Sequence, residues 1–319
     1  MKRLLELITF ILLLVSCNQD KPSQTLRSAY YWSTTWNMDS CKTSFIREHD
    51  IKRLYVRYFD VVKDDAGNIA PNATIQFGAS PMPKGIEIVP TVYIVNDCMK
   101  ANNSTQGKDE GKSSSDILAN KILTRILQIS EANDIPQAKE IQIDCDWTAS
   151  TQEAYFDFLK ELREKAKVQG IKLSATIRLH QLSMTPPPVD KGVLMMYNTG
   201  DARQLKCQKP ILDMKDVAPY IQHLSSYPLP LSAAYPLFRW HILFREGKFV
   251  GFMHDDDAFP ILPGDSIVVR QPEMTDIMEA VKSINAQNKE INNEVILFDL
   301  NNQNIKRFSS EDYEKIFRH

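Results

Sequence analysis

Strand-like runs alternate with helix-like runs along almost the whole chain. The strand-like runs, rich in β-branched and aromatic residues, cover 29–36, 53–62, 86–95, 140–148, 172–182, 192–198, 231–240 and 294–300. The helix-like runs, which carry apolar residues at helical spacing, cover 39–49, 115–132, 150–169, 215–225, 275–286 and 309–318. Strands that alternate with helices form a parallel sheet covered by helices, and eight of them in one domain favour a closed barrel.

We therefore predict an α/β fold, a (β/α)8 TIM barrel. A turn at Glu246-Gly247-Lys248 follows the seventh strand-like run and predicts a β-hairpin extension there. A doubly wound open sheet is the alternative. The chain contains no Gly-x-Gly-x-x-Gly or Walker pattern that would support it, and we expect no cofactor.

The first 17 residues are typical of a bacterial lipoprotein signal peptide. Lys2 and Arg3 are followed by a mostly apolar run over 4–15, and the run ends at Cys17 in a sequence that resembles a lipobox. The run is too short to span a bilayer. We expect a lipid on Cys17, a flexible tether over 18–27 and one barrel domain over 28–319, held in the cell envelope at the outer membrane of a Gram-negative-type bacterium. Cleavage nearby to give a secreted protein is the alternative.

The composition excludes some partners. The formal net charge is −2, so the chain lacks the basic footprint of a nucleic-acid-binding protein. The four other cysteines, Cys41, Cys98, Cys145 and Cys207, form no Cys-x-x-Cys pair, so a zinc site is unsupported and their disulfide pairing stays open. We expect no metal site. The acidic run at 254–257 is interpreted as a solvated turn. The polar run at 100–115 is interpreted as either a lid or a solvated loop.

The fourth strand-like run carries two carboxylates on an otherwise apolar strand. Side chains alternate between the faces of a strand, so Asp144, Asp146 and Thr148 share one face while Cys145 and Trp147 share the other. Carboxylates in such a place cost free energy unless they are paired, hydrated or functional. An ion-paired network inside the barrel is the structural alternative to a functional site.

The carboxyl ends of barrel strands meet at one mouth, where active sites of this fold lie. Polar and aromatic residues near the predicted strand ends are Trp32, Asp60, Asp144, Asp146, Arg178, His180, Tyr197, Asn198, Arg239 and Asp299, with Arg57, Tyr235, Trp36, Trp147 and Trp240 as further candidates. Sugar rings stack on aromatic faces, and their hydroxyls bind to charged groups. The set therefore predicts a glycan-binding cleft.

Two short motifs resemble chitinase-like glycoside hydrolases. The segment 141–147 resembles their fourth-strand signature, in which spaced aspartates lead to Asp-Trp-Glu, and 194–198 resembles their sixth-strand Met-x-Tyr-Asp element, with Asn198 in place of the aspartate. The whole chain also resembles uncharacterised bacterial barrel proteins related to those hydrolases. The resemblance implies that Asp146 orients the acetamido group of a sugar, that Asp144 supports Asp146, and that Tyr197 contacts the acetamido group.

The chain departs from that family at the general acid, because Thr148 stands where the glutamate is expected. Either Asp146 acts as the acid, with a pKa raised by Asp144, or Asp60 or Asp299 supplies a second carboxylate. We thus expect a membrane-anchored barrel that binds a glycan, with hydrolysis left open. The alternatives are a non-catalytic glycan-binding lipoprotein and a structural envelope scaffold.

Overall fold

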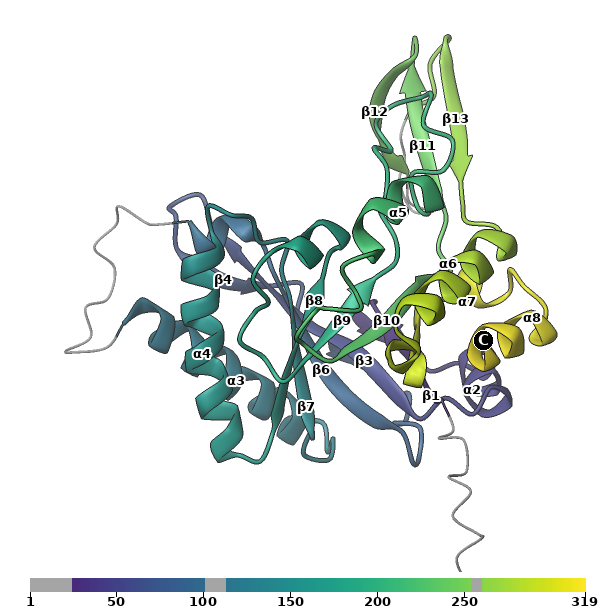
Figure 1. The fold of residues 1–319 in the computed structure, drawn as a ribbon. Coiled ribbons are helices and arrows are strands. Elements are labelled where there is room, and N and C mark those ends of the chain that lie inside the picture. The colour runs from purple at the N-terminus through teal and green to yellow at the C-terminus, as the bar shows by residue number, and fades with distance from the viewer. Residues whose placement is uncertain (1–24, 101–112, 254–259) are drawn as a thin grey trace, which may run out of the picture.

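The computed structural model describes residues 25–100, 113–253 and 260–319 (Figure 1). The signal peptide with Cys17, the predicted tether up to residue 24, most of the polar run at 100–115 and the acidic run at 254–257 lie outside the described residues.

The eight predicted strands form a closed parallel barrel. In order around the ring they are β1 (Leu26–Tyr31), β3 (Arg53–Lys63), β6 (Glu87–Ile94), β7 (Glu140–Asp144), β8 (Lys172–Ile177), β9 (Lys191–Met195), β10 (Leu231–Pro236) and β14 (Glu294–Phe298). The first strand pairs with both β3 and β14, and this closes the ring. The (β/α)8 prediction is confirmed and the open-sheet alternative is wrong.

Helices cover the outside of the ring. They are α2 (Ser40–Glu48), α3 (Ser114–Ala132), α4 (Gln152–Val168), α5 (Met214–Ile221), α6 (Met274–Gln287), α7 (Asn302–Ile305) and α8 (Ser310–Arg318), with short 3-10 helices η1 (Asn96–Met99), η2 (Leu179–Ser183) and η3 (Lys289–Asn293). The buried residues of α4 show why it packs there: Tyr155, Phe158, Leu159 and Leu162 recur at the spacing of one helix face. One hydrophobic core fills the space between the strands and these helices.

Several strands end earlier than their sequence pattern suggests, and the first and fifth predicted runs show how. The first predicted run, 29–36, divides into β1 and β2 (Thr35–Trp36), which pairs with β5 (Gln76–Phe77). The fifth stops at Ile177, because the side chain of Gln181 accepts a hydrogen bond from the Arg178 backbone N–H at 2.8 Å and the chain turns into η2. His180 therefore lies on a 3-10 turn, and the prediction that it continues the strand face of Arg178 is wrong.

A small antiparallel sheet projects from the barrel after the seventh strand (Figure 1). It contains β11 (Trp240–Arg245), β12 (Lys248–Met253) and β13 (Asp265–Arg270), with β11 in the centre. The predicted hairpin is thus confirmed and carries a third strand. A further short strand, β4 (Ile69–Asn72), pairs antiparallel with β3 outside the ring.

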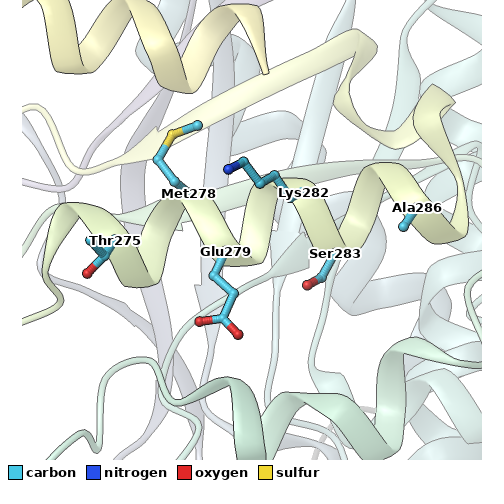
Figure 2. A pocket seen from close by; sticks show the side chains of 6 residues that line it. All are labelled: Thr275, Met278, Glu279, Lys282, Ser283 and Ala286. Carbon is cyan, nitrogen blue, oxygen red and sulfur yellow. The ribbon is translucent and has the colours of Figure 1, made fainter.

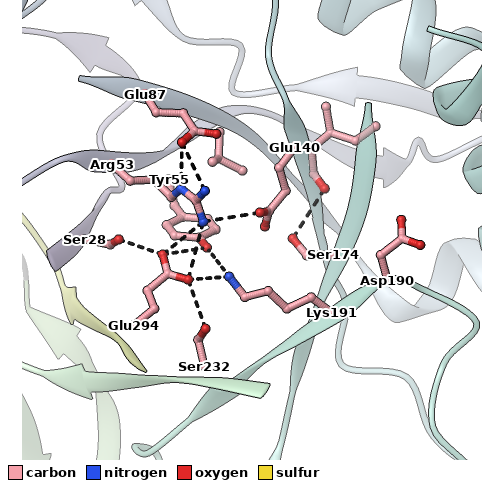
Figure 3. A network of polar contacts seen from close by, with 12 residues as sticks. Ser28, Arg53, Tyr55, Glu87, Glu140, Ser174, Asp190, Lys191, Ser232 and Glu294 are labelled. Atoms are coloured by element: carbon pink, nitrogen blue, oxygen red, sulfur yellow. Dashed lines mark hydrogen bonds and ion pairs between the residues drawn. The ribbon is translucent and has the colours of Figure 1, made fainter. Parts of the chain in front are cut away.

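The amino end of the barrel is closed by charged side chains (Figure 3). Arg53 binds Glu87 at 3.1 Å, Glu294 at 3.3 Å and Glu140 at 3.4 Å. Lys191 forms an ion pair with the same Glu294. Burial raises the pKa of Glu294, but Lys191 and Arg53 outweigh burial and hold this pKa below its usual value. Four of these five residues, Arg53, Glu140, Lys191 and Glu294, begin β3, β7, β9 and β14, which are alternate strands of the ring.

Candidate functional site

Strand β7 sends a column of polar side chains into the barrel. Gln142 is fully buried and Asp144 is 3 % exposed, whereas the Asp146 side chain, just past the end of the strand, is 53 % exposed at the mouth. The expected alternation is observed, since Ile143, Cys145 and Trp147 on the other face are all fully buried against the helix layer. The two aspartates therefore lie one above the other, the upper one open to solvent.

Arg178 connects the two aspartates. Its Nη2 donates to Asp144 Oδ1 at 3.1 Å, and its Nε forms an ion pair with Asp146. Thr176 Oγ1 also donates to Asp144, at 2.6 Å. Burial raises the pKa of Asp144 above its ordinary value, and the contacts with Arg178 and Thr176 offset only part of that rise. The aspartates are thus ion-paired, as the structural alternative predicted. They nevertheless lie at the mouth of the barrel, and Asp146 is half exposed there.

Near the two aspartates, two buried polar atoms have no hydrogen-bond partner among the described residues. They are the Tyr197 hydroxyl and the Gln142 side-chain nitrogen. The other polar atom of Gln142 accepts from the Tyr30 hydroxyl at 2.7 Å. Burial raises the pKa of Tyr197, so its hydroxyl stays protonated at neutral pH. Buried polar groups in native proteins usually bind protein, water or ligand, so these two atoms are candidates to meet a ligand group or an ordered water.

A row of aromatic rings runs from the mouth to the projecting sheet. Ring centroids are 5.6 Å apart for Trp32 and Phe298, 5.7 Å for Phe298 and Phe238, 5.4 Å for Phe238 and Trp240, and 5.0 Å for Trp240 and Phe252. Four of the five rings are half-buried and Phe252 is exposed, so each can offer part of a face or an edge to a ligand. Flat aromatic surface next to carboxylates is the arrangement that sugar rings require.

Two predicted carboxylates do not join the pair. Asp60 is buried in an ion pair with Arg57, whose Nε donates to Asp60 at 2.8 Å, and the Arg57 guanidinium lies over the Trp32 ring at 5.5 Å. Asp299 accepts from Asn304 in α7 at 2.5 Å, and burial raises its pKa to about 6. Among the described residues, neither aspartate forms a hydrogen bond or ion pair that links it to Asp144 or Asp146, so the structure gives no support to either as a second catalytic acid.

Thr148 also has local partners. Its side chain is exposed, and its hydroxyl lies 3.0 Å from that of Ser150 and 3.4 Å from that of Thr151. Thr151 in turn donates to Asn96 at 2.7 Å. The position expected for the general acid is therefore occupied by a hydroxyl group, which is too weak an acid to protonate a leaving group at neutral pH.

The remaining predicted residues lie on the exposed rim. His180 and Asn198 are exposed, and burial together with Arg178 lowers the pKa of His180. Arg239 is exposed and lies 3.5 Å from Gln303. These three side chains surround the mouth without direct contacts to the aspartates.

Three aromatic candidates were wrong. Trp147 is fully buried between the barrel and α4, where its ring stacks on Tyr155. Trp36 packs on Tyr31 with centroids 4.8 Å apart, and Tyr235 donates to buried Asn292 at 2.7 Å. Each belongs to the outer face of its strand or to the layer behind it, where an aromatic ring supplies packing.

Four residues near the aspartates were not predicted: Tyr30, Tyr93, Gln142 and Thr176. Alternation would have found Gln142 and Thr176, because each lies two residues before a predicted residue of the same strand, Asp144 and Arg178. The pKa of Tyr93 is raised to about 12 by burial and by the two aspartates, which places this phenol beside them.

Two cavities in the described part of the chain lie away from these residues. One, of about 410 Å³, is lined only by one side of α6, from Thr275 to Ala286 (Figure 2). The other, of about 300 Å³, lies beside α4 and includes Arg163 and Asp190. No predicted site residue lines either of them, so their size carries no functional argument.

Some site types find no support in the described part of the chain. No group of three or more His, Cys, Asp or Glu side chains there could hold a metal ion. Cys41, Cys98, Cys145 and Cys207 are all free thiols. Among residues 25–100, 113–253 and 260–319, no helix is both long and apolar enough to cross a bilayer.

No protein-family model and no curated protein sequence matches the chain. Solved structures do match. A chitinase from Chromobacterium violaceum has a TM-score of 0.54 and 11 % identity, over 92 % of this chain and 98 % of that one. The spore cortex-lytic enzyme SleL of Bacillus cereus has a TM-score of 0.54 and 16 % identity, over 92 % and 74 %. An Ostrinia furnacalis chitinase catalytic domain, an E2180L mutant in complex with penta-N-acetylchitooctaose, has a TM-score of 0.53 and 10 % identity, over 92 % and 95 %. This chain is therefore a TIM barrel whose fold is similar to that of these chitinases.

Proposed function

We propose that this protein binds a glycan at the mouth of its barrel and does not hydrolyse it efficiently. The observation that carries the proposal is the composition of the mouth. Two aspartates share one arginine beside a row of aromatic rings, while a threonine occupies the place of the acid. The matched chitinase structures support the same kind of ligand through their shared fold, although one fold hosts many functions.

Each part of the mouth suits a sugar. Asp146, half exposed, accepts hydrogen bonds from hydroxyl or amide groups of the ligand, and charge-assisted bonds of this kind are about twice as strong as neutral ones. The Tyr197 hydroxyl offers a donor at greater depth. Trp32 and Phe298 supply apolar surface for the flat face of a sugar ring.

The weak point of hydrolysis is proton donation. General acid catalysis is typically worth about 10²–10⁴-fold in rate, and Thr148 cannot supply it. Asp60 and Asp299, each held by its own partner, leave the aspartate pair without a second acid. Binding without turnover therefore agrees with the residues better than catalysis does.

N-acetylated chitooligosaccharides of two to six units are the first ligands to test, by titration calorimetry of the purified protein and by product analysis after long incubation. We expect saturable binding with no release of shorter sugars. Lys282→Ala, on the outside of α6, is the matched control and should bind like wild type. Product formation at a rate typical of glycosidases would contradict the loss of hydrolysis, and the absence of binding to any glycan on an array would contradict the glycan proposal.

We also propose that the barrel is anchored to the outer membrane through a lipid on Cys17. The support is the sequence pattern of the leader alone. Cys17→Ser should move the protein from the membrane fraction to the soluble fraction and abolish incorporation of a labelled fatty acid. Unchanged fractionation together with unchanged labelling would exclude this site of lipid attachment.

A further inference from the structure

Arg178 makes a contact that gives the aspartate pair a definite chemical role. One edge of its guanidinium meets both carboxylates, through Nη2 to Asp144 at 3.1 Å and through Nε to Asp146. The Arg178 side chain is 18 % exposed and that of Asp144 is 5 % exposed, so solvent screens this part of the contact only weakly. A planar guanidinium in this position fixes both carboxylates in direction as well as in charge.

The position of the arginine is itself fixed by Gln181. The backbone N–H of Arg178 donates to the side-chain oxygen of Gln181 at 2.8 Å, and the side-chain nitrogen of Gln181 donates to the Trp147 carbonyl at 3.1 Å. Gln181 is fully buried. It ties the end of β8 to the end of β7, so the guanidinium and the two carboxylates are held by one rigid connection.

A carboxyl group can act as general acid only while it carries a proton. A guanidinium in direct contact favours the ionised form of a carboxyl group, so it opposes that role. The possibility that Asp146 replaces the missing acid therefore conflicts with the contact that Asp146 makes.

We propose that Arg178 is a positioning residue that keeps the buried Asp144 carboxylate ionised against its burial and fixes the Asp146 carboxylate beside it as a hydrogen-bond acceptor. The inference concerns the chemical state of the aspartates in the free protein. It rests on the proposed function only in that these acceptors are the ones a glycan would meet.

The test is a titration of the aspartate carboxyl carbons by NMR in the purified full chain, with Asp144→Asn and Asp146→Asn to assign the two signals. Arg178→Gln removes the positive charge and should move the midpoint of Asp144 upward. Thr176→Val is the matched control, because it removes only the neutral hydrogen bond to the same oxygen. We expect a clearly larger shift in Arg178→Gln than in Thr176→Val, with Arg178→Lys in between.

Other titratable groups that face the pair are common to all these variants. They are Tyr30 in β1, Tyr93 in β6, Cys145 after β7, Tyr155 in α4, His180 in η2 and Tyr197 after β9. Their contributions cancel in the comparison between variants. An Asp144 midpoint that moves no further in Arg178→Gln than in Thr176→Val would overturn the proposal.

A second measurement covers the case in which Arg178→Gln does not fold. The exchange of the Arg178 Nε–H with water should be slow in wild type and markedly faster in Asp146→Asn, whose changed side chain is half exposed and should not affect folding. Equal exchange rates would show that Asp146 does not hold the arginine, and the proposal would fail. Neither measurement needs a ligand, so both can succeed or fail independently of glycan binding.

Discussion

The two ends of the barrel use the same residue types in opposite ways. Strand β7 contributes to both, with Glu140 at the amino end and Asp144 at the carboxyl end. An arginine from another strand meets each of them, Arg53 below and Arg178 above. Below, three carboxylates, an arginine and a lysine are bound to one another inside the barrel (Figure 3). Above, one of the two aspartates is half exposed at the mouth.

This difference indicates that the charged groups at the amino end stabilise the fold, whereas those at the carboxyl end are placed to bind a ligand. Charges that satisfy one another inside a fold contribute to its integrity, and removal of one partner leaves the others buried and uncompensated. Polar groups that can still form hydrogen bonds at the mouth of the barrel are available to a ligand. Whether a carboxylate at the end of a barrel strand contributes to stability or to ligand binding can be inferred only when its partners are known. Four predictions would break or sharpen this comparison.

The largest effect is expected at the amino end. Arg53→Met removes the cation that Glu87, Glu140 and Glu294 share, and loss of one partner from a buried ion pair costs about 3–5 kcal/mol. We expect a loss of about 3 kcal/mol, because Arg53 is 15 % exposed. Urea denaturation measures it. Lys160→Ala, which removes an exposed pair with Asp157, is the control and should change stability by under about 1 kcal/mol. Equal losses in both variants would remove the proposed role of the lower network.

Asp299 should give the barrel a pH-dependent stability of the opposite sign to that of Glu294. Its pKa in the folded protein is about 6, above the ordinary value, so between about pH 4 and 6 the folded state binds more protons than the unfolded state. Its contribution is therefore fully present at low pH and is lost as the pH rises through 6. Relative to Asp299→Asn, the wild type should lose about 2–3 kcal/mol between pH 4 and 7. A constant difference between the two proteins over that range would contradict the assignment.

At the carboxyl end, Asp146→Asn should weaken glycan binding with little effect on folding. A hydrogen bond to a charged group contributes about 1.5–3 kcal/mol, so affinity should fall by at least about tenfold. The melting temperature should stay close to that of wild type, since the side chain is 53 % exposed. Calorimetry and thermal unfolding check the two parts. Unchanged affinity with intact folding would show that Asp146 is not a ligand group.

The smallest effect is expected from the aromatic row. Trp240→Leu keeps an apolar side chain but removes the flat ring beside Phe238 and Phe252. Aromatic contacts contribute about 0.5–1.5 kcal/mol beyond their buried area, so affinity should fall about two- to tenfold. The loss should be larger for long oligosaccharides than for short ones if the row is part of the site. Val269→Ala, on the opposite face of the small sheet, serves as the control.

The sequence alone determined the fold and identified β7 as the strand that carries the two aspartates. Eight apolar, β-branched runs separated by amphipathic helices have few ways to bury themselves, and the alternation of Asp144 and Asp146 with Cys145 and Trp147 fixed their faces correctly. The prediction failed for Trp36, because β1 ends before it, at Tyr31. It failed for Tyr235 because this residue lies three positions after inward-facing Ser232, so that alternation places it on the outer face.

Only the tertiary structure decided which charges meet. Arg53 and Glu294 are far apart in the chain, and so are Arg178 and Asp144, yet each pair lies in contact because the barrel closes and sets the register of its strands. Periodicity along a chain encodes which face a side chain occupies. It does not encode the partner across the barrel, since that depends on strand order, on stagger and on the point at which Gln181 ends β8.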